Sequence, residues 1–250
     1  MATDRSVWVV LPTYNEVDNI GPISEAVLGA LPDAHVLIAD DNSPDGTGAA
    51  ADALAAADPR IHVLHRPGKQ GIGPAYVAGF REAMRQGAEI LVQMDADFSH
   101  PVRFLPGLVA PILDGRADVV LGSRYVPGGR IPRWSLPRRF ISRGGCLFAQ
   151  VLLWLPYRDL TGGFKAIHRD VLERIDLDSI HAGGYAFQIE TTFRAHRAGA
   201  RMEQLPFTFE ERREGQSKMS GAIVVEALKV VLALRFAAFS GAIPVRKPVA

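Results

Sequence analysis

Short and almost continuously apolar runs recur along the first half of the chain, at residues 7–11, 35–39, 61–64, 90–94 and 119–122. Runs without polar alternation are typical of strands buried on both faces of a parallel sheet. Residues 17–30, 48–57, 74–86 and 101–114 lie between them and have the spacing of helices. The connections are short, as in β–α–β units. This pattern predicts an α/β fold with a largely parallel central sheet flanked by helices.

Two of the predicted strands end in paired carboxylates. One leads into Asp95-Ala96-Asp97, and another leads from Ala39 into Asp40-Asp41. Like charges this close repel and raise each other's pKa unless a cation lies between them. A hard divalent ion that carries a diphosphate is a usual occupant of such a site. Because open α/β sheets bind ligands at the carboxyl ends of their strands, we expect one crevice for a nucleotide and Mg²⁺ or Mn²⁺.

The loop after Asp97 also has a purely structural interpretation. Ser99 suits a helix N-cap, and Pro101 suits the first turn of a helix. The same loop can cap a helix and hold a metal, so both interpretations stand. His100, in the same loop, is interpreted as structural rather than as a catalytic base.

Size and charge limit the class of protein. A chain of 250 residues suits a single α/β domain, and a net charge of +1 provides no global basic field for nucleic acid. The single cysteine, Cys146, excludes an internal disulfide and fits a reducing compartment. Residues 7–11 are too short for the apolar core of a signal peptide. We therefore expect a cytoplasmic location and no nucleic-acid partner.

The second half of the chain begins with a basic stretch at residues 124–143 that contains no acidic residue. An apolar run follows at 146–156, about half the ~20 residues needed to cross a bilayer. This order is typical of a segment at a membrane surface, although a core helix with a solvated basic lead-in fits equally. Residues 221–243 are also apolar, but Glu226, Lys229 and Arg235 interrupt them. Each such charge costs about 2.5–3.5 kcal/mol at a bilayer centre. We therefore expect residues 221–243 to pack on the domain with partial membrane contact rather than to span the membrane.

Further short motifs fit a nucleotide site. In Leu11-Pro12-Thr13-Tyr14-Asn15-Glu16, the proline stiffens the loop, the tyrosine ring suits a nucleobase face and the glutamate can accept from a base or ribose. In the segment after the second strand, Asp41 is a better ligand candidate than Asp45, because Asp41 lies at the strand end. Asp45 and Gly46 are expected to form a structural turn.

Taken together and in order, these segments resemble the family 2 glycosyltransferases of the GT-A fold, and within them the polyprenol (dolichol) phosphate mannose synthase group. The resemblance covers nearly the whole chain from residue 7 to about 235. The matching segments are 11–16, 40–47, 71–76, 94–100, 122–125, 141–144, 159–164 and 215–218. The resemblance implies a GT-A domain over residues 1–236, with an acceptor and membrane-interface region at about 124–157 and a tail at 237–250.

The resemblance also implies roles for individual residues. Side chains or backbone that would bind the nucleotide sugar are Pro12, Tyr14, Glu16, Ala39, Asp41, Asp95, Ala96, Asp97, Arg212 and Lys218. Asp97, with Asp95, would ligate the metal, and Arg212 and Lys218 would neutralise the diphosphate. Arg124, Arg138 and Ser142 would hold the acceptor phosphate. Asp97, Arg212, Lys218 and Arg124 would form the catalytic set.

The implied reaction is inverting transfer of mannose from GDP-mannose to polyprenyl phosphate, releasing GDP. A peripheral protein on the cytoplasmic face of the membrane is expected, and a separate membrane-anchoring protein is an open alternative. Another donor, such as UDP-glucose, on the same lipid phosphate is the nearest rival. A non-catalytic nucleotide-sugar-binding protein is a second alternative, against which the acidic and basic site residues argue.

Overall fold

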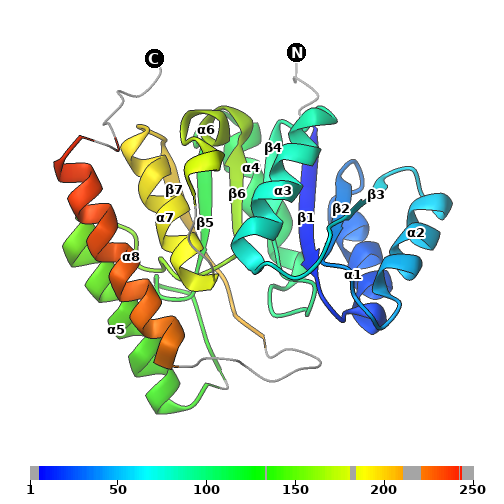
Figure 1. Ribbon diagram of the computed structural model, residues 1–250. Helices are drawn as coiled ribbons and strands as arrows, with labels where there is room; N and C mark the ends of the chain where they lie inside the picture. Colours follow the sequence, from blue (N-terminus) through cyan, green and yellow to red (C-terminus); the bar gives the residue numbers. More distant parts are fainter. Residues whose placement is uncertain (1–5, 133, 181–183, 211–220, 242, 244–250) are drawn as a thin grey trace.

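The computed structural model describes residues 6–132, 134–180, 184–210, 221–241 and 243. At its centre is a seven-stranded sheet with strand order β3-β2-β1-β4-β6-β5-β7 (Figure 1). β6 is antiparallel to its neighbours β4 and β5, whereas the other neighbouring strands are parallel. The strands are β1 (Val7–Thr13), β2 (His35–Asp40), β3 (Ile61–His65), β4 (Ile90–Gln93), β5 (Val119–Ser123), β6 (Lys165–His168) and β7 (Met202–Pro206).

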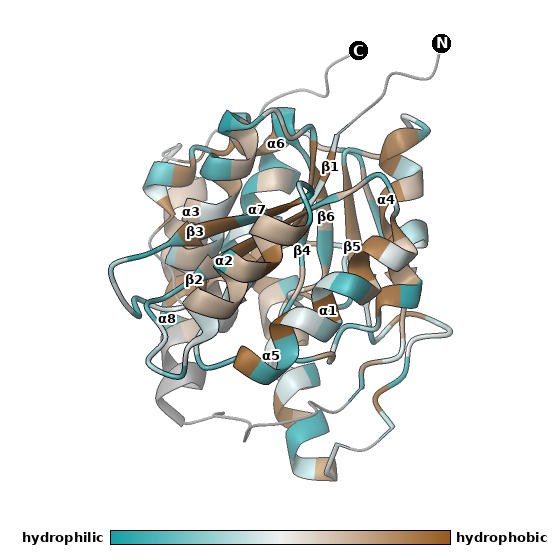
Figure 2. Cartoon of the chain, turned by 90° about the vertical axis from the view of Figure 1, so that its right-hand side faces the viewer, coloured by the Kyte–Doolittle hydropathy of each residue, from teal (hydrophilic) through white to brown (hydrophobic). Residues whose placement is uncertain are grey.

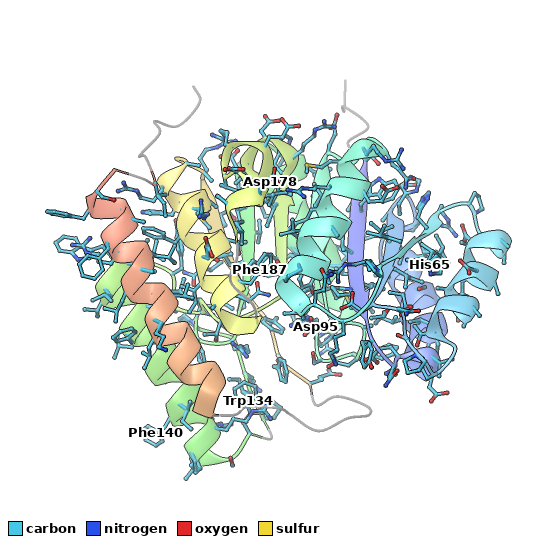
Figure 3. All side chains as sticks on the ribbon, in the orientation of Figure 1. His65, Asp95, Trp134, Phe140, Asp178 and Phe187 are labelled. Atoms are coloured by element: carbon cyan, nitrogen blue, oxygen red, sulfur yellow. The ribbon has the colours of Figure 1, made fainter. Side chains whose placement is uncertain are left out.

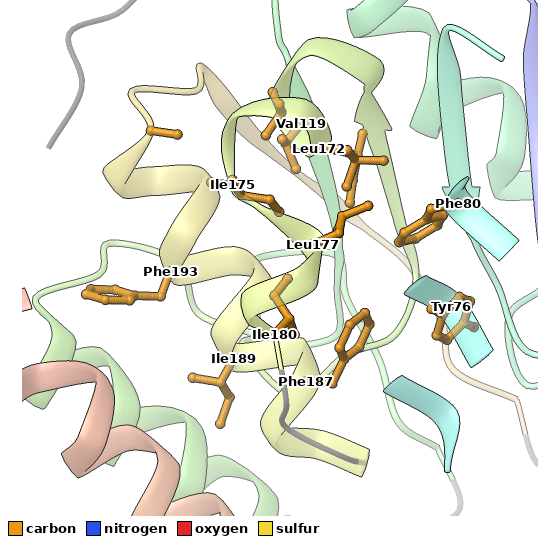
Figure 4. Packing of buried hydrophobic residues seen from close by; sticks show 14 of the residues in the cluster. Tyr76, Phe80, Val119, Leu172, Ile175, Leu177, Ile180, Phe187, Ile189 and Phe193 are labelled. Carbon is orange, nitrogen blue, oxygen red and sulfur yellow. The ribbon is translucent and has the colours of Figure 1, made fainter. Parts of the chain in front are cut away.

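Helices cover both faces of this sheet. Their bounds are α1 (Val17–Ala30), α2 (Thr47–Ala57), α3 (Ile72–Arg85), α4 (Leu105–Leu113), α5 (Leu136–Leu153), α6 (Arg169–Arg174), α7 (Gly184–Arg197) and α8 (Gly221–Phe239). One apolar core joins one sheet face to α3, α5, α6, α7 and α8, and includes Tyr76, Phe80 and Phe187 (Figure 4). A second core joins the other face to α1, α2 and α4. Strands β1, β2 and β5 are apolar along most of their length (Figure 2), as expected for a sheet buried on both faces.

The predicted α/β fold is confirmed. Each of the predicted strands and helices in the first half of the chain is present, with ends that differ by a few residues at most. Beyond them, β6 and β7 complete the sheet at the side away from β3. Because β6 runs against its neighbours, its loops place residues 159–163 beside the carboxyl ends of the parallel strands.

The helix expected at residues 146–156 starts ten residues earlier, so that prediction is corrected. α5 spans Leu136–Leu153, with Ser135 at its N-cap and Pro137 in its first turn. Proline is favoured there because the first-turn N–H groups have no partner within the helix. The helix ends at Trp154, which has a φ of 56°. Much of the basic stretch therefore belongs to the helix itself, and Leu153 and Leu155 face the core.

α5 and α8 pack side by side and reach beyond the carboxyl ends of the parallel strands (Figure 1). α8 runs to Phe239, past the expected boundary at 236, and the carbonyl of Ile243 accepts a hydrogen bond from Arg197 at 2.7 Å. Among the described helices, none is both long enough and apolar enough to cross a membrane.

Candidate active site at the carboxyl ends of the strands

A cavity of about 740 Å³ opens at the carboxyl ends of the parallel strands. Of the residues predicted to bind substrate, it brings together Pro12, Tyr14, Glu16, Asp41, Asp95, Arg124 and Arg138. Ala39, Ala96, Asp97 and Ser142 are buried and do not form part of its wall. Arg212 and Lys218 lie outside the described residues. Asp95 and Trp134 mark two sides of this region in Figure 3.

Hydrogen bonds between two loops shape the end of the cavity near β1 and β2. Asp45 accepts from the Thr47 hydroxyl at 2.6 Å and from the backbone N–H of Val17 at 3.2 Å. Gly46 has a φ of 92°, a conformation that glycine adopts without steric cost. Both residues are therefore structural, as predicted. The Lys69 ammonium lies 3.9 Å from the centre of the Tyr14 ring and adds a positive charge to this end of the cavity.

Asp41 forms a buried ion pair with Arg66 at the same end of the cavity. Burial raises the pKa of the Asp41 carboxyl, and the adjacent guanidinium opposes this rise. Arg66 also donates to Gln70 at 3.1 Å. The arginine thus holds the Asp41 carboxylate at the cavity wall and compensates its charge.

The acidic loop after β4 is held in place by buried side chains. The Tyr76 hydroxyl donates to Asp95 Oδ1 at 3.1 Å, and the backbone N–H of Asp95 donates to His100 Nδ1 at 3.1 Å. The His100 ring stacks on Phe164, with 5.1 Å between the ring centres. These contacts agree with a structural role for His100, which orients the loop that carries both aspartates.

The oxygen-rich loop suits a hard divalent cation. Asp97 Oδ1 accepts from the backbone N–H of Ser99 at 3.0 Å. The Ser99 hydroxyl is buried and has no hydrogen-bond partner among the described residues. The described part of the chain contains no group of three or more His, Cys, Asp or Glu side chains placed to bind a metal. A cation bound by Asp95 and Asp97 would therefore take further ligands from a diphosphate or water, which fits Mg²⁺ and Mn²⁺.

Arg124 lies on the opposite side of the cavity and pairs with Asp159. Arg124 Nε donates to Asp159 Oδ2 and Arg124 Nη2 donates to Asp159 Oδ1, each at 2.7 Å. Nη2 also donates to the Thr161 hydroxyl at 3.0 Å. Burial alone would raise the pKa of Asp159, but the Arg124 charge and its hydrogen bonds lower it below the ordinary value. The basic stretch contains no acidic residue of its own, but Arg124 obtains its counter-charge from Asp159 in a distant segment.

Arg138 and Ser142 lie on successive turns of α5 near this wall. The Arg138 guanidinium is stacked 3.9 Å from the centre of the Trp134 ring. The Tyr125 hydroxyl donates to the Ser142 hydroxyl at 2.8 Å. Arg138 thus reaches the cavity, whereas Ser142 contacts a neighbouring residue behind it.

The outer side of α5 and α8 exposes large apolar side chains. We call these residues the α5–α8 apolar face: Leu136, Phe140, Ile141, Leu147, Val151, Trp154, Leu228, Leu232, Phe236 and Phe239. Phe140 is 77% exposed, and it projects near the end of the helix pair in Figure 3. Arg235 of α8 lies 5.8 Å from the centre of the Trp154 ring, which joins the two helices on this side. Soluble monomers rarely expose so many large apolar side chains together.

Several residues in the cavity wall or behind it were not identified from the sequence. Asp159 and Tyr76 are buried behind the wall and lie in segments that carried the family resemblance, but no pattern indicated that they contact Arg124 and Asp95. Trp134 and Gln188 line the cavity itself. The position of Trp134 within the basic stretch was the one sequence feature that could have indicated its place in the site.

Comparisons with known proteins identify the family. Residues 8–176 match the sequence profile described as Glycosyl transferase family 2. The chain is 47% identical over 222 residues to the undecaprenyl-phosphate mannosyltransferase of Micrococcus luteus, covering 89% of this chain and 90% of the relative. It is also 47% identical over 227 residues to the polyprenol monophosphomannose synthase of Mycolicibacterium smegmatis, covering 90% of this chain and 85% of the relative.

Solved structures match the fold. The crystal structure of glucosyl-3-phosphoglycerate synthase from Mycobacterium tuberculosis, with Mn²⁺, UDP and glucosyl-3-phosphoglycerate, has a TM-score of 0.68 at 21% identity. The match covers 92% of this chain and 79% of that one. Mannosyl-3-phosphoglycerate synthase from Rubrobacter xylanophilus has a TM-score of 0.67 at 17% identity, covering 98% and 78%. The predicted GT-A fold is confirmed.

Proposed function

The chain belongs to glycosyl transferase family 2, and on this premise we propose that it transfers mannose from GDP-mannose to polyprenyl phosphate. The observation that carries the proposal is the cavity itself, which has aspartates on one side and arginines on the other. The arginine side adjoins the α5–α8 apolar face, from which a lipid acceptor can approach. The names of the two relatives at 47% identity support this choice of sugar and acceptor.

The acceptor in this reaction is already a nucleophile. A phosphate monoester has its second pKa near ~6 and is largely dianionic at neutral pH, so it needs no general base. Its oxygen forms a bond to the anomeric carbon of mannose while the bond from that carbon to GDP breaks. GDP leaves with the bonding electron pair. Attack from the side opposite GDP inverts the configuration, giving a β-linked product from an α-linked donor.

The leaving diphosphate needs electrostatic stabilisation. Asp95 and Asp97 would hold Mg²⁺ or Mn²⁺, which would supply positive charge to the diphosphate. Arg212 and Lys218 would add charge from the segment between β7 and α8. Tyr14, Pro12, Glu16 and the Asp41–Arg66 pair would surround the nucleoside. Ala39 and Ala96 would support this site through the backbone.

Arg138 and Arg124 would hold the acceptor phosphate at the cavity wall, with Ser142 behind them. Replacing Arg138 with alanine should raise the KM for a short-chain polyprenyl phosphate by ~10-fold or more, because hydrogen bonds to charged groups contribute about 1.5–3 kcal/mol. The KM for GDP-mannose should stay unchanged, since the two phosphates approach from opposite sides of the sugar. Initial rates with either substrate varied measure both constants.

Arg85→Ala is the control for Arg138→Ala, because Arg85 is an exposed arginine of α3 that pairs with Glu82. A rise in donor KM with an unchanged acceptor KM would contradict the assignment of Arg138. The same assay, with Mg²⁺ and a panel of nucleotide sugars, tests the function. Transfer from UDP-glucose but not from GDP-mannose would favour the rival donor, and no transfer at all would favour a non-catalytic protein.

The α5–α8 apolar face would rest on the cytoplasmic surface of the membrane. Its apolar side chains would enter the acyl region, and Arg143, Lys229 and Arg235 would attract anionic headgroups at about 1 kcal/mol each. Phe140→Glu and Phe236→Glu should each weaken binding to anionic liposomes by at least ~10-fold, because burying a phenylalanine is worth about 1.5–3 kcal/mol. Liposome co-sedimentation measures this.

Leu113→Glu is the matched control for the liposome experiment, because Leu113 is 43% exposed on α4, outside the α5–α8 apolar face. It should bind liposomes as the wild type does. Equal binding by all of these proteins would contradict membrane contact through this face. Absence of liposome binding by the wild type would instead favour a separate membrane-anchoring protein.

A further inference from the structure

Trp134 presents a buried hydrogen-bond donor at the cavity wall. The residue is 8% exposed and lies just before α5. Its indole Nε1 is buried, and no residue that the structure describes accepts a hydrogen bond from it. Buried N–H groups are rarely left in this state, because they give up a hydrogen bond to water when the chain folds. A donor of this kind in a cavity wall indicates an acceptor supplied by a ligand.

The Trp134 ring is held by its neighbours. Arg138 lies 3.9 Å and Arg124 lies 5.2 Å from the ring centre, measured from the guanidinium carbons. Phe209 packs against the ring edge to face, at 5.3 Å and 73°. Cations attracted to the ring face and an aromatic partner restrict its rotation. The direction of the indole N–H is therefore set by packing before a ligand binds.

The charges around Trp134 define the class of ligand. Two guanidinium groups contact the ring, and an indole N–H can only donate. Two guanidinium groups and one indole N–H at the same wall suit the oxygens of an anion. Arg124 directs Nε and Nη2 to Asp159, so its paired donors on that side are engaged within the protein. An anion at this wall therefore needs a donor besides Arg124, and Trp134 lines the cavity with an indole N–H that has no acceptor among the described residues.

We infer that Trp134 is a substrate-binding residue that donates its indole N–H to a phosphoryl oxygen of the acceptor and holds the Arg138 guanidinium beside the same phosphate. This inference rests on the proposed function, since it assigns a residue to the acceptor of that reaction. A phosphoryl group could also come from the donor diphosphate. The acceptor is favoured because Trp134 adjoins α5, which carries the exposed Phe140 (Figure 3), whereas Tyr14, Lys69 and Asp41 line the part of the cavity near β1 and β2.

Trp134→Phe separates the two roles of the side chain, because phenylalanine keeps an aromatic face for Arg138 but lacks the N–H. The KM for short-chain polyprenyl phosphate should rise by ~10-fold, the effect of losing one hydrogen bond to a charged group. The KM for GDP-mannose should not change. Trp134→Leu should have a larger effect, since it also removes the platform for Arg138. An unchanged acceptor KM in Trp134→Phe, or a raised donor KM instead, would overturn the inference.

Trp8→Phe is the matched control, because Trp8 lies near the amino end of β1, away from the cavity, where its indole N–H donates to Ser6 at 2.9 Å. It should leave both KM values unchanged. Thermal melting of each variant separates a binding defect from a folding defect. A Trp134→Phe protein with a wild-type melting temperature and a raised acceptor KM supports the inference.

A binding measurement decides the inference separately from turnover. The chain has 3 tryptophans, so Trp8→Phe combined with Trp154→Phe leaves Trp134 as the only indole. Its fluorescence should change saturably with short-chain polyprenyl phosphate and not with GDP. No change with the prenyl phosphate, or a change with GDP alone, would overturn the inference. If the wild type transfers no mannose, the proposed function fails, while this titration still shows whether Trp134 contacts a phosphorylated lipid.

Discussion

Replacing Asp97 with asparagine should lower the rate of mannosyl transfer by at least ~10²-fold, a loss typical of removing one group that stabilises developing charge. Asparagine can still accept the hydrogen bond from the Ser99 N–H, so the turn should persist while the metal-binding charge is lost. Asp95→Asn should have a smaller effect than Asp97→Asn. Steady-state rates at saturating Mg²⁺, with melting temperatures measured in parallel, test both expectations.

Metal removal provides the complementary experiment. Excess EDTA should abolish transfer by the wild type, and added Mg²⁺ or Mn²⁺ should restore it. Asp52→Asn is the control, because Asp52 pairs with His65 at the surface and does not line the cavity. Full turnover in EDTA, or a wild-type rate for Asp97→Asn, would contradict the proposed role of the acidic loop.

Replacing Asp159 with asparagine should lower the free energy of unfolding by about 3–5 kcal/mol, because it leaves the Arg124 charge buried without its counter-ion. In a chain of this size, the melting temperature should fall by roughly 6–20 °C. The lowered pKa of Asp159 means that the pair stabilises the fold above the carboxyl's unfolded-state pKa, and that this contribution is lost as pH falls through the folded-state pKa. Thermal unfolding between neutral and acid pH should therefore show a smaller pH dependence for the variant.

Two further variants separate the stability role of the pair from a role in catalysis. Glu203→Gln breaks the exposed pair with Arg116 and should cost less than about 1 kcal/mol. The double variant Arg124→Met, Asp159→Leu should recover much of the stability, since apolar replacements of buried pairs are often tolerated. Its activity should remain low if Arg124 also binds the acceptor. Recovery of both stability and activity would limit Arg124 to a structural role.

The first half of the fold could be predicted from the sequence because its strands and connections depend on residues that are neighbours along the chain. Apolar runs such as 90–94 form buried strands wherever a sheet can cover both faces, and connections this short allow few alternatives to parallel β–α–β units. The same locality placed Asp95 and Asp41 at one edge of the sheet, because the carboxyl ends of neighbouring parallel strands meet there. Hence much of the nucleotide side of the site could be predicted without coordinates.

The arginine side of the site depended on contacts between distant segments. Arg124 meets Asp159 only because β6 runs antiparallel between β4 and β5, which places the loop before β6 beside the end of β5. β6 itself has no strand-like apolar run, since it begins with the buried Lys165. That ammonium donates to the carbonyl of Gln188 and the hydroxyl of Thr192 on α7, at 2.8 and 2.9 Å. Burial disfavours the charged form of Lys165 and lowers its pKa to about 7. The acceptors on α7 offset part of this cost, so the lysine can occupy the sheet only when α7 is in place.

The sequence by itself therefore determined the sheet-forming runs, the acidic strand ends, and the basic and apolar segments of the C-terminal half. Only the tertiary structure decided that Arg124 has a counter-ion, that two guanidinium groups lie near the Trp134 ring, and that α5 begins at Leu136 rather than within its apolar run. The physical reason is the range of the interactions. Strand and helix periodicity arises from neighbours along the chain, whereas charge pairing and cavity shape arise from residues that approach one another only when the sheet and its helices have assembled.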